Sequence, residues 1–71
     1  MTDSQELRTK IRDSGLRLDY LCEKLGITYA TLRRKIANEN EFMASEISTL
    51  TYLLHLSDDE RDKIFFALEG E

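Results

Sequence analysis

The stretch LRLDYLCEKLGITYATLRRKI, which spans residues 16–36, decides the fold class of this chain. Its apolar residues recur at helical spacing in two short blocks that meet at Gly26, and the whole chain contains no proline. We predict one helix at about Leu18–Leu25 and a second at about Tyr29–Asn38. Glycine adopts the positive φ that a sharp turn between helices needs, so Gly26 ends the first helix. The stretch therefore predicts two helices held at a fixed angle.

The second of these helices is predicted to carry its cations on an exposed face. Leu32 and Ile36 point into the core, whereas on the other side residues three and four positions apart share one face. That face combines a phenol ring, a small methyl group and two guanidinium groups: Tyr29, Ala30, Arg33 and Arg34. Arginine pairs bidentately with guanine or grips a phosphate, so this face suits the major groove of DNA. With Lys35 the helix holds a run of three cations. The alternative interpretation is a solvated, charged helix surface.

Three further helices are predicted around this pair. The first spans about Ser4–Ser14, with Asp3 as its N-cap and Glu6 placed to complete a capping box. Another spans about Ala44–Leu54, and the last begins after the capping box that Ser57 opens. The apolar positions of all five helices and their turns are expected to form the core: Leu7, Ile11, Leu18, Leu21, Cys22, Leu25, Ile27, Leu32, Ile36, Phe42, Ile47, Leu50, Leu54 and Ile64. We therefore predict a compact all-α fold.

Length and charge limit the possible functions. The 71 residues allow one small domain, which we place at residues 1–71. The net charge of −4 argues against a nucleic-acid partner, but residues 7–36 carry a net charge of +5 and residues 37–71 a net charge of −7. A surface polarised in this way attracts phosphate on one side and repels it on the other. Small helical proteins also acquire uneven charge by chance, so the pattern supports a nucleic-acid partner only weakly.

Other classes of protein have little support in the sequence. No signal peptide and no apolar run of membrane length is evident, and Cys22, the single cysteine, cannot form an internal disulfide. We expect a cytoplasmic protein with no membrane partner. His55 is the one general base that titrates near neutral pH, and no nucleophile stands at motif spacing from it. We therefore expect neither an enzyme nor a bound cofactor or metal.

Residues 16–36 resemble the helix-turn-helix of the lambda-repressor-like and Cro-like regulators. The resemblance is carried by apolar or small residues, by the turn glycine and by the cap of the recognition helix: Leu21, Cys22, Leu25, Gly26, Ile27, Thr28, Leu32 and Ile36. The continuation Phe42–Phe66, with its Glu46-Ile47 pair, resembles the short phage-type members found in Gram-positive bacteria and their prophages. The resemblance implies a five-helix lambda-repressor-like domain and a sequence-specific DNA-binding transcriptional regulator.

In that family the second helix of the motif, here about residues 28–38, enters the major groove. The residues that we expect to contact DNA are Arg17, Thr28, Tyr29, Ala30, Arg33, Arg34, Lys35 and Asn38. Family members commonly begin the first helix of the motif with Ser or Thr followed by Gln, whose amide grips a phosphate. Here Arg17 and Leu18 stand at those places, so we expect Arg17 to supply the phosphate contact by its charge.

Two kinds of partner are expected. One recognition helix covers only a few base pairs, so regulators of this kind commonly bind double-stranded operator DNA as homodimers, with half-sites about 34 Å apart. Phe65, Phe66 and Leu68 are the candidate dimer surface, and their alternative role is plain core. A second hypothesis is a protein-binding modulator of a repressor, which would use the acidic C-terminal half: Glu39, Glu41, Asp58, Asp59 and Asp62.

Overall fold

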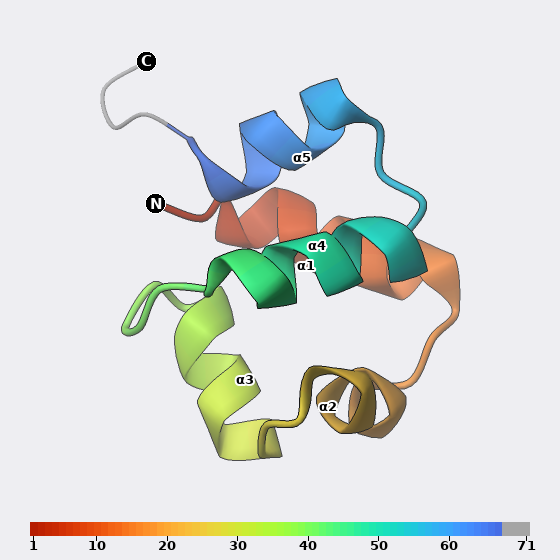
Figure 1. Cartoon of the computed structure of the whole chain (residues 1–71), viewed down its shortest axis with the longest axis vertical. Coiled ribbons are helices and arrows are strands. Elements are labelled where there is room, and N and C mark those ends of the chain that lie inside the picture. The colour runs from red at the N-terminus through yellow and green to blue at the C-terminus, as the bar shows by residue number, and fades with distance from the viewer. Residues whose placement is uncertain (68–71) are drawn as a thin grey trace.

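The computed structural model describes residues 1–67, and these residues form five helices joined by short turns (Figure 1). The helices are α1 (Ser4–Ser14), α2 (Leu18–Leu25), α3 (Tyr29–Ile36), α4 (Ala44–Leu53) and α5 (Asp58–Phe65). Within residues 1–67 no strand is present, which confirms the predicted all-α class. None of the helices in this range is long and apolar enough to cross a membrane.

The predicted bounds are correct for α1 and α2, and two other helices end earlier than predicted. The helix α3 ends at Ile36 rather than at Asn38, and α4 ends at Leu53 rather than at Leu54. Left-handed residues follow both helices, with φ of 65° at Asn38 and 54° at His55. A left-handed residue cannot continue a right-handed helix, so each of them stops the helix before it.

The helices form two groups that meet at the core. In Figure 1, α1, α4 and α5 lie across one end of the molecule, and α2 and α3 lie at the other end. The helix α4 packs against α2 and α5, while α1 packs against α3 and α5. The pair α2–α3 is therefore supported from behind by α4 and α1 and leaves its other side open.

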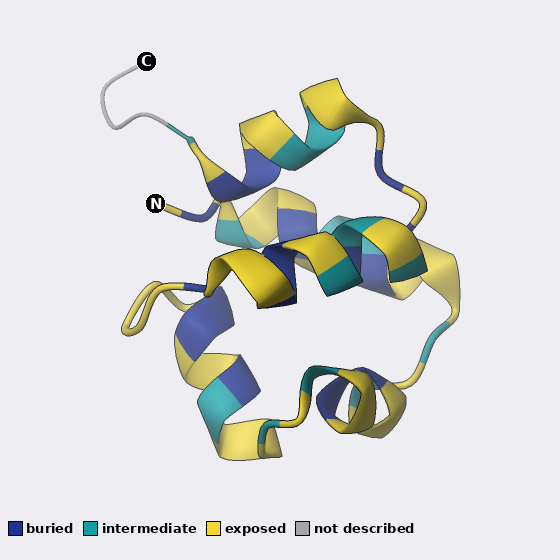
Figure 2. Ribbon diagram, viewed as in Figure 1, coloured by how far each residue is buried: buried dark blue, intermediate teal, exposed yellow. Residues whose placement is uncertain are grey.

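Each helix contributes one fully enclosed side chain to the core. These side chains are Leu7, Leu21, Leu32, Leu50 and Ile64. Buried positions occur in all five helices (Figure 2). The expected core positions Leu18, Leu25 and Ile27 are only partly buried and pack at the edge of the cluster. Leu56, which was not expected in the core, is buried in the turn before α5. Because every helix buries an apolar residue in one shared cluster, loosening one helix exposes the others.

The capping predictions hold in part. At α1 the backbone N–H of Asp3 donates to the carbonyl of Ile64 at 2.7 Å, so Glu6 does not complete the predicted capping box. The carboxylate of Asp3 accepts a hydrogen bond from the backbone N–H of Glu6 at 3.1 Å, which confirms Asp3 as the N-cap of α1. At α5 both bonds of the predicted capping box form. The hydroxyl of Ser57 accepts from the N–H of Glu60 at 3.1 Å, and the carboxylate of Glu60 accepts from the N–H of Ser57 at 2.9 Å. Both helices therefore begin where their capping residues predict.

Glu60 also joins α5 to α1. The ammonium of Lys10 donates a hydrogen bond to the second oxygen of the Glu60 carboxylate at 2.5 Å. The bond from Lys10, followed by the bond from the backbone of Ser57, lowers the pKa of Glu60 to about 2. The same ion pair raises the pKa of Lys10. The two helices are thus held together by a charge pair outside the apolar core.

The variant Glu60→Gln is expected to lower the free energy of unfolding at pH 7, because its amide cannot form the ion pair with Lys10. The folded-state pKa of Glu60 is about 2, below its ordinary value of 4.5, so the stabilisation is complete above pH 4.5 and is lost as the pH falls toward 2. Urea unfolding from pH 7 to pH 2 should show the two proteins converging at the acid end.

Asp59→Asn is the matched control, since Asp59 lies in the same first turn of α5 and forms no ion pair among the described residues. The control removes a charge near the helix N-terminus and leaves the bond between Lys10 and Glu60 intact. A stability deficit of Glu60→Gln that stays constant down to pH 2 would contradict the assignment.

Candidate nucleic-acid interface

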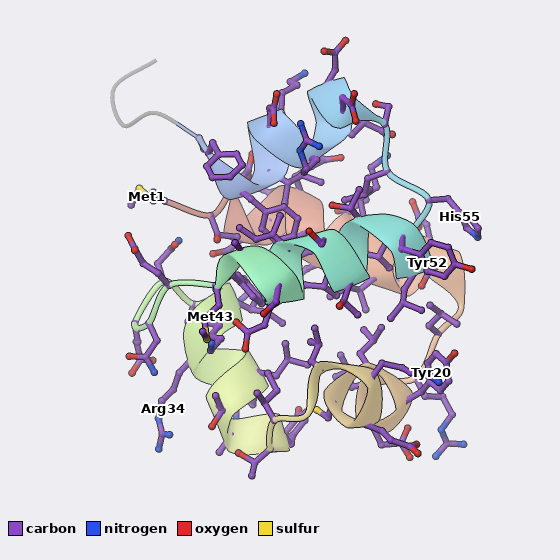
Figure 3. The ribbon with its side chains drawn as sticks, viewed as in Figure 1. Met1, Tyr20, Arg34, Met43, Tyr52 and His55 are labelled. Carbon is purple, nitrogen blue, oxygen red and sulfur yellow. The ribbon has the colours of Figure 1, made fainter. Side chains whose placement is uncertain are left out.

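The exposed face of α3 carries the side chains that the sequence analysis placed there. Tyr29 is 52% exposed, and Ala30, Arg33 and Arg34 are also exposed. Arg34 points away from the helix into solvent (Figure 3). The guanidinium of Arg33 lies over the ring of Tyr29, 5.8 Å from its centroid. Within residues 1–67 neither arginine forms an ion pair with an acid of the chain, so both remain available to an anionic partner.

The turn before α3 fixes the direction of this face. Gly26 has φ of 71°, a left-handed conformation that residues with a side chain rarely adopt. After this turn the backbone N–H of Ile27 donates to the carbonyl of Cys22 at 3.1 Å. The hydroxyl of Thr28 then caps α3 by accepting from the N–H of Thr31 at 3.1 Å. Thr28 is exposed at the start of the helix, but its side chain is already used in the cap.

Lys35 does not belong to the exposed face, and the expectation of three exposed cations is wrong. Its side chain is 10% exposed, and its ammonium lies 2.6 Å from the carboxylate of Glu46 in α4. The same carboxylate oxygen accepts the backbone N–H of Met43 at 2.8 Å. Lys35 follows Leu32 by three positions and precedes Ile36, so helical periodicity places it on the inner side. That spacing was the signal in the sequence that could have shown its burial.

Asn38 also has a structural role instead of the expected contact with DNA. Its side-chain amide donates to the carbonyl of Thr2 at 2.7 Å and accepts from the N–H of Thr2 at 2.8 Å. The hydroxyl of Ser4 donates to the carbonyl of Ile36 beside it. These bonds hold the N-terminal segment against the end of α3. The polar atoms of Asn38 are thereby engaged within the protein, and we remove this residue from the candidate interface.

Arg17 lies at the N-terminus of α2 with its side chain 84% exposed. Its guanidinium is 3.3 Å from the carboxylate of Asp19, and an exposed pair of this kind contributes little stability, so Arg17 can exchange partners. Arg17 lines a shallow hollow together with Leu18 and Tyr29. The fold therefore brings Arg17 near the first turn of α3.

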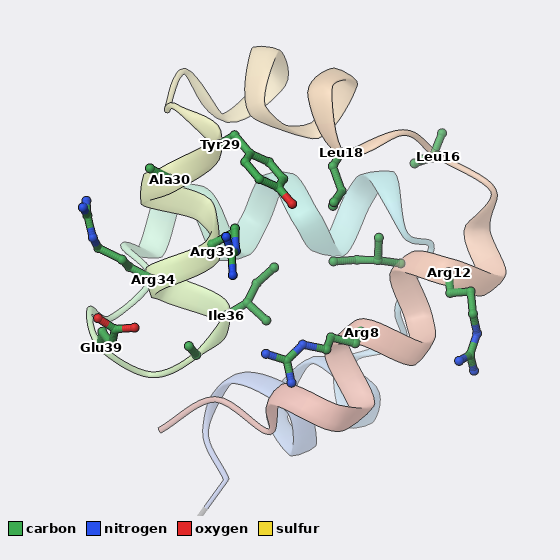
Figure 4. A pocket seen from close by; sticks show the side chains of 12 residues that line it. Arg8, Arg12, Leu16, Leu18, Tyr29, Ala30, Arg33, Arg34, Ile36 and Glu39 are labelled. Atoms are coloured by element: carbon green, nitrogen blue, oxygen red, sulfur yellow. The ribbon is translucent and has the colours of Figure 1, made fainter.

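Two further arginines, which the sequence analysis did not assign to the interface, lie beside α3. Arg8 and Arg12 of α1 and Arg33 and Arg34 of α3 line an open groove of about 730 Å³. Arg8 and Arg33 face each other across it, whereas the guanidinium groups of Arg12 and Arg34 point outward (Figure 4). The half-buried Leu16 and Leu18 and the buried Ile11 and Ile36 also line this groove. The spacing of residues along α1 does not indicate which other helix its arginines approach. The net positive charge of residues 7–36 was the signal in the sequence that these arginines and those of α3 could lie together.

The candidate dimer residues separate into two environments. Phe65 is only 4% exposed and packs edge-on against Phe42, with ring centroids 5.4 Å apart and an interplanar angle of 82°. Phe65 is therefore core, and its assignment to a dimer surface is wrong. Phe66 is 56% exposed, while Leu68 lies outside the described residues.

Residues with nucleophilic or metal-binding potential do not assemble into a second site. Cys22 is buried, and burial raises the pKa of its thiol, with a further increase from the charge of Asp19. A buried thiol with a raised pKa is a poor nucleophile. Among residues 1–67, histidine, cysteine and carboxylate side chains form no group of three or more that could hold a metal ion.

Comparison of the chain with protein-family models, with curated proteins and with solved structures finds no match.

The Lys35–Glu46 pair supplies a test of how α3 is held. Lys35→Met leaves a buried carboxylate without its cation, and we expect a loss of about 3 kcal/mol in the free energy of unfolding. The double variant Lys35→Met, Glu46→Gln should recover part of that loss, because the neutral amide still accepts the N–H of Met43 and no buried charge remains. Urea unfolding followed by circular dichroism measures both. A single variant as stable as the wild type would contradict a buried pair.

Proposed function

We propose that this chain is a sequence-specific DNA-binding transcriptional regulator of the lambda-repressor-like and Cro-like kind, with α2 and α3 as its helix-turn-helix. In this proposal α3 lies in the major groove and presents Tyr29, Ala30, Arg33 and Arg34 to the DNA. The resemblance of residues 16–36 to that motif supports the assignment, and the resemblance of the continuation supports a phage or prophage origin.

One observation carries the proposal. The adjacent guanidinium groups of Arg33 and Arg34 are exposed and form no ion pair within residues 1–67, while the opposite side of the same helix is buried. These two guanidinium groups contribute nothing to the core. They are hydrogen-bond donors, carried on one helix, that base edges or phosphates can accept from. Arginine bound bidentately to guanine is the commonest specific contact of this type.

The distribution of acids is compatible with this orientation. The acidic first turn of α5, with Asp58 and Asp59, lies at the end of the molecule away from α2 and α3 (Figure 1). A duplex that approaches α3 therefore meets the basic part of the chain first. The acids of α5 lie where phosphate is not expected, whereas Glu39 lies beside α3.

The acids on α5 favour one alternative, a protein-binding modulator of a repressor. Asp58, Asp59 and Asp62 are exposed and would contact a basic partner. Arg61 pairs with two of them, at 3.4 Å to Asp58 and 3.0 Å to Asp62, which reduces the free charge of this surface. The two functions use opposite ends of the molecule, so substitutions on α3 distinguish them.

The double variant Arg33→Ala, Arg34→Ala is expected to lose about 30-fold or more in affinity for operator DNA, since each good bidentate contact contributes about 1–3 kcal/mol. The probe is a short duplex selected from a random pool by the wild-type protein, and fluorescence anisotropy measures the affinity. Arg61→Ala, Lys63→Ala is the matched control, because it removes the same charge from α5. If Arg33→Ala, Arg34→Ala binds the duplex with unchanged affinity, the DNA-binding proposal is wrong and the modulator hypothesis remains.

We also propose that the regulator binds its operator as a homodimer that includes the exposed ring of Phe66. Met1 lies next to it: the carbonyl of Met1 accepts the N–H of Ala67 at 3.1 Å, and Met1 is 58% exposed. Met1 and Phe66 line one small hollow together with Phe42 and Phe65.

Phe66→Ser is expected to weaken self-association in sedimentation equilibrium, because it removes an apolar ring from the contact. Tyr52→Ser is the control, since Tyr52 is another aromatic residue that is 79% exposed and lies on α4. If the wild-type protein and both variants sediment as monomers at every concentration, the dimer proposal is wrong.

A further inference from the structure

We propose that Arg8 of α1 and Arg33 of α3 form a clamp for one sugar–phosphate strand of the duplex that α3 binds, with Arg12 as a further cation at the end of the same groove. This inference rests on the proposed function and adds a second helix to the DNA contact. It assigns the groove between α1 and α3 to the backbone of the DNA, whereas the face of α3 is assigned to its bases.

The geometry of the groove provides the first argument. Arg8 from α1 and Arg33 from α3 line the same opening from its two sides (Figure 4). Tyr29, Ala30, Arg33 and Arg34 belong both to this groove and to the exposed face of α3. A duplex seated on α3 must therefore place part of one strand over the groove. The groove is continuous with the proposed interface and is not a separate cavity.

The charges of the groove provide the second argument. Four arginines line it, and Glu39 is the one acid among its lining residues. Arg8 forms no ion pair with any acid of residues 1–67. Arg12 is 3.6 Å from Asp13, but both side chains are more than half exposed, and pairs of this kind contribute little. The arginines of α1 are therefore not needed for the fold and can bind phosphate.

The apolar lining of the groove provides the third argument. It consists of Ile11, Leu16, Leu18 and Ile36, whose side chains offer no polar atom that competes for the guanidinium groups. Apolar side chains of this kind can contact the carbon face of a deoxyribose, and they limit the water around the phosphate. A charge-assisted hydrogen bond between arginine and phosphate is stronger where fewer waters compete. The groove thus fits a chain that alternates sugars with anions.

The experiment measures how affinity depends on salt. Arg8→Ala and Arg12→Ala are titrated against the selected duplex and against an unrelated duplex at several salt concentrations. Each variant is expected to reduce the magnitude of the slope of log affinity against log salt by about 1, and to weaken both duplexes equally. Arg8→Lys should restore most of the slope, because a phosphate contact needs charge more than a bidentate shape.

Lys63→Ala on α5 is the matched control, since it removes one exposed cation remote from α3 and should leave the slope at its wild-type value. Circular dichroism confirms that each variant is folded. If Arg8→Ala and Arg12→Ala behave as Lys63→Ala does while Arg33→Ala, Arg34→Ala loses affinity, the clamp is wrong and the proposed function stands. If the wild type binds neither duplex, both are wrong.

A different class of occupant would also be detected. An oligoglutamate peptide is titrated against the same proteins, because an acidic peptide could use the same arginines. If Arg8→Ala weakens binding of the peptide and leaves the salt slope for the duplex unchanged, the groove is a peptide site and the clamp is overturned. The clamp is supported if Arg8→Ala reduces the salt slope for the duplex and leaves the preference for the selected duplex unchanged.

Discussion

The buried ion pair between Lys35 and Glu46 is the constraint on which the position of α3 depends. Its two side chains are 10% and 8% exposed, and the carboxylate also accepts the backbone N–H of Met43 at the start of α4. One carboxylate thus fixes both the C-terminal part of α3 and the first turn of α4. A buried charge without its partner costs several kcal/mol, so rotating α3 away from this arrangement is unfavourable. The outward direction of Arg33 and Arg34 follows from the inward direction of Lys35.

The same three consecutive cations therefore have different roles. Lys35 forms part of the scaffold, whereas the two arginines before it are exposed and form no ion pair with an acid of residues 1–67. The difference arises because successive residues on a helix are about 100° apart, and Lys35 falls on the side of Leu32 and Ile36. A polar residue on the inner side of α3 needs a partner, and α4 supplies it.

At the other end of α3, Asn38 and the N-terminal segment complete the support. The amide of Asn38 makes two hydrogen bonds with the backbone of Thr2, which ties α1 to the end of α3. This connection holds α1 beside the exposed face of α3, where Arg8 and Arg12 line the groove between the two helices. The fold thus brings together arginines from separate segments of the chain, with Arg8 and Arg12 of α1 and Arg17 before α2 lying near α3.

The sequence by itself determined the five helices, their caps at Asp3, Thr28 and Ser57, and the outward face of α3, because periodicity and capping act over a few neighbouring residues. Tertiary structure alone decided between the core and the dimer surface for Phe65, paired Phe65 with Phe42, linked Asn38 to Thr2 and brought Arg8 to α3. Each of these depends on residues far apart in the chain, whose meeting is set by how the helices pack. Local spacing carries no information about that packing.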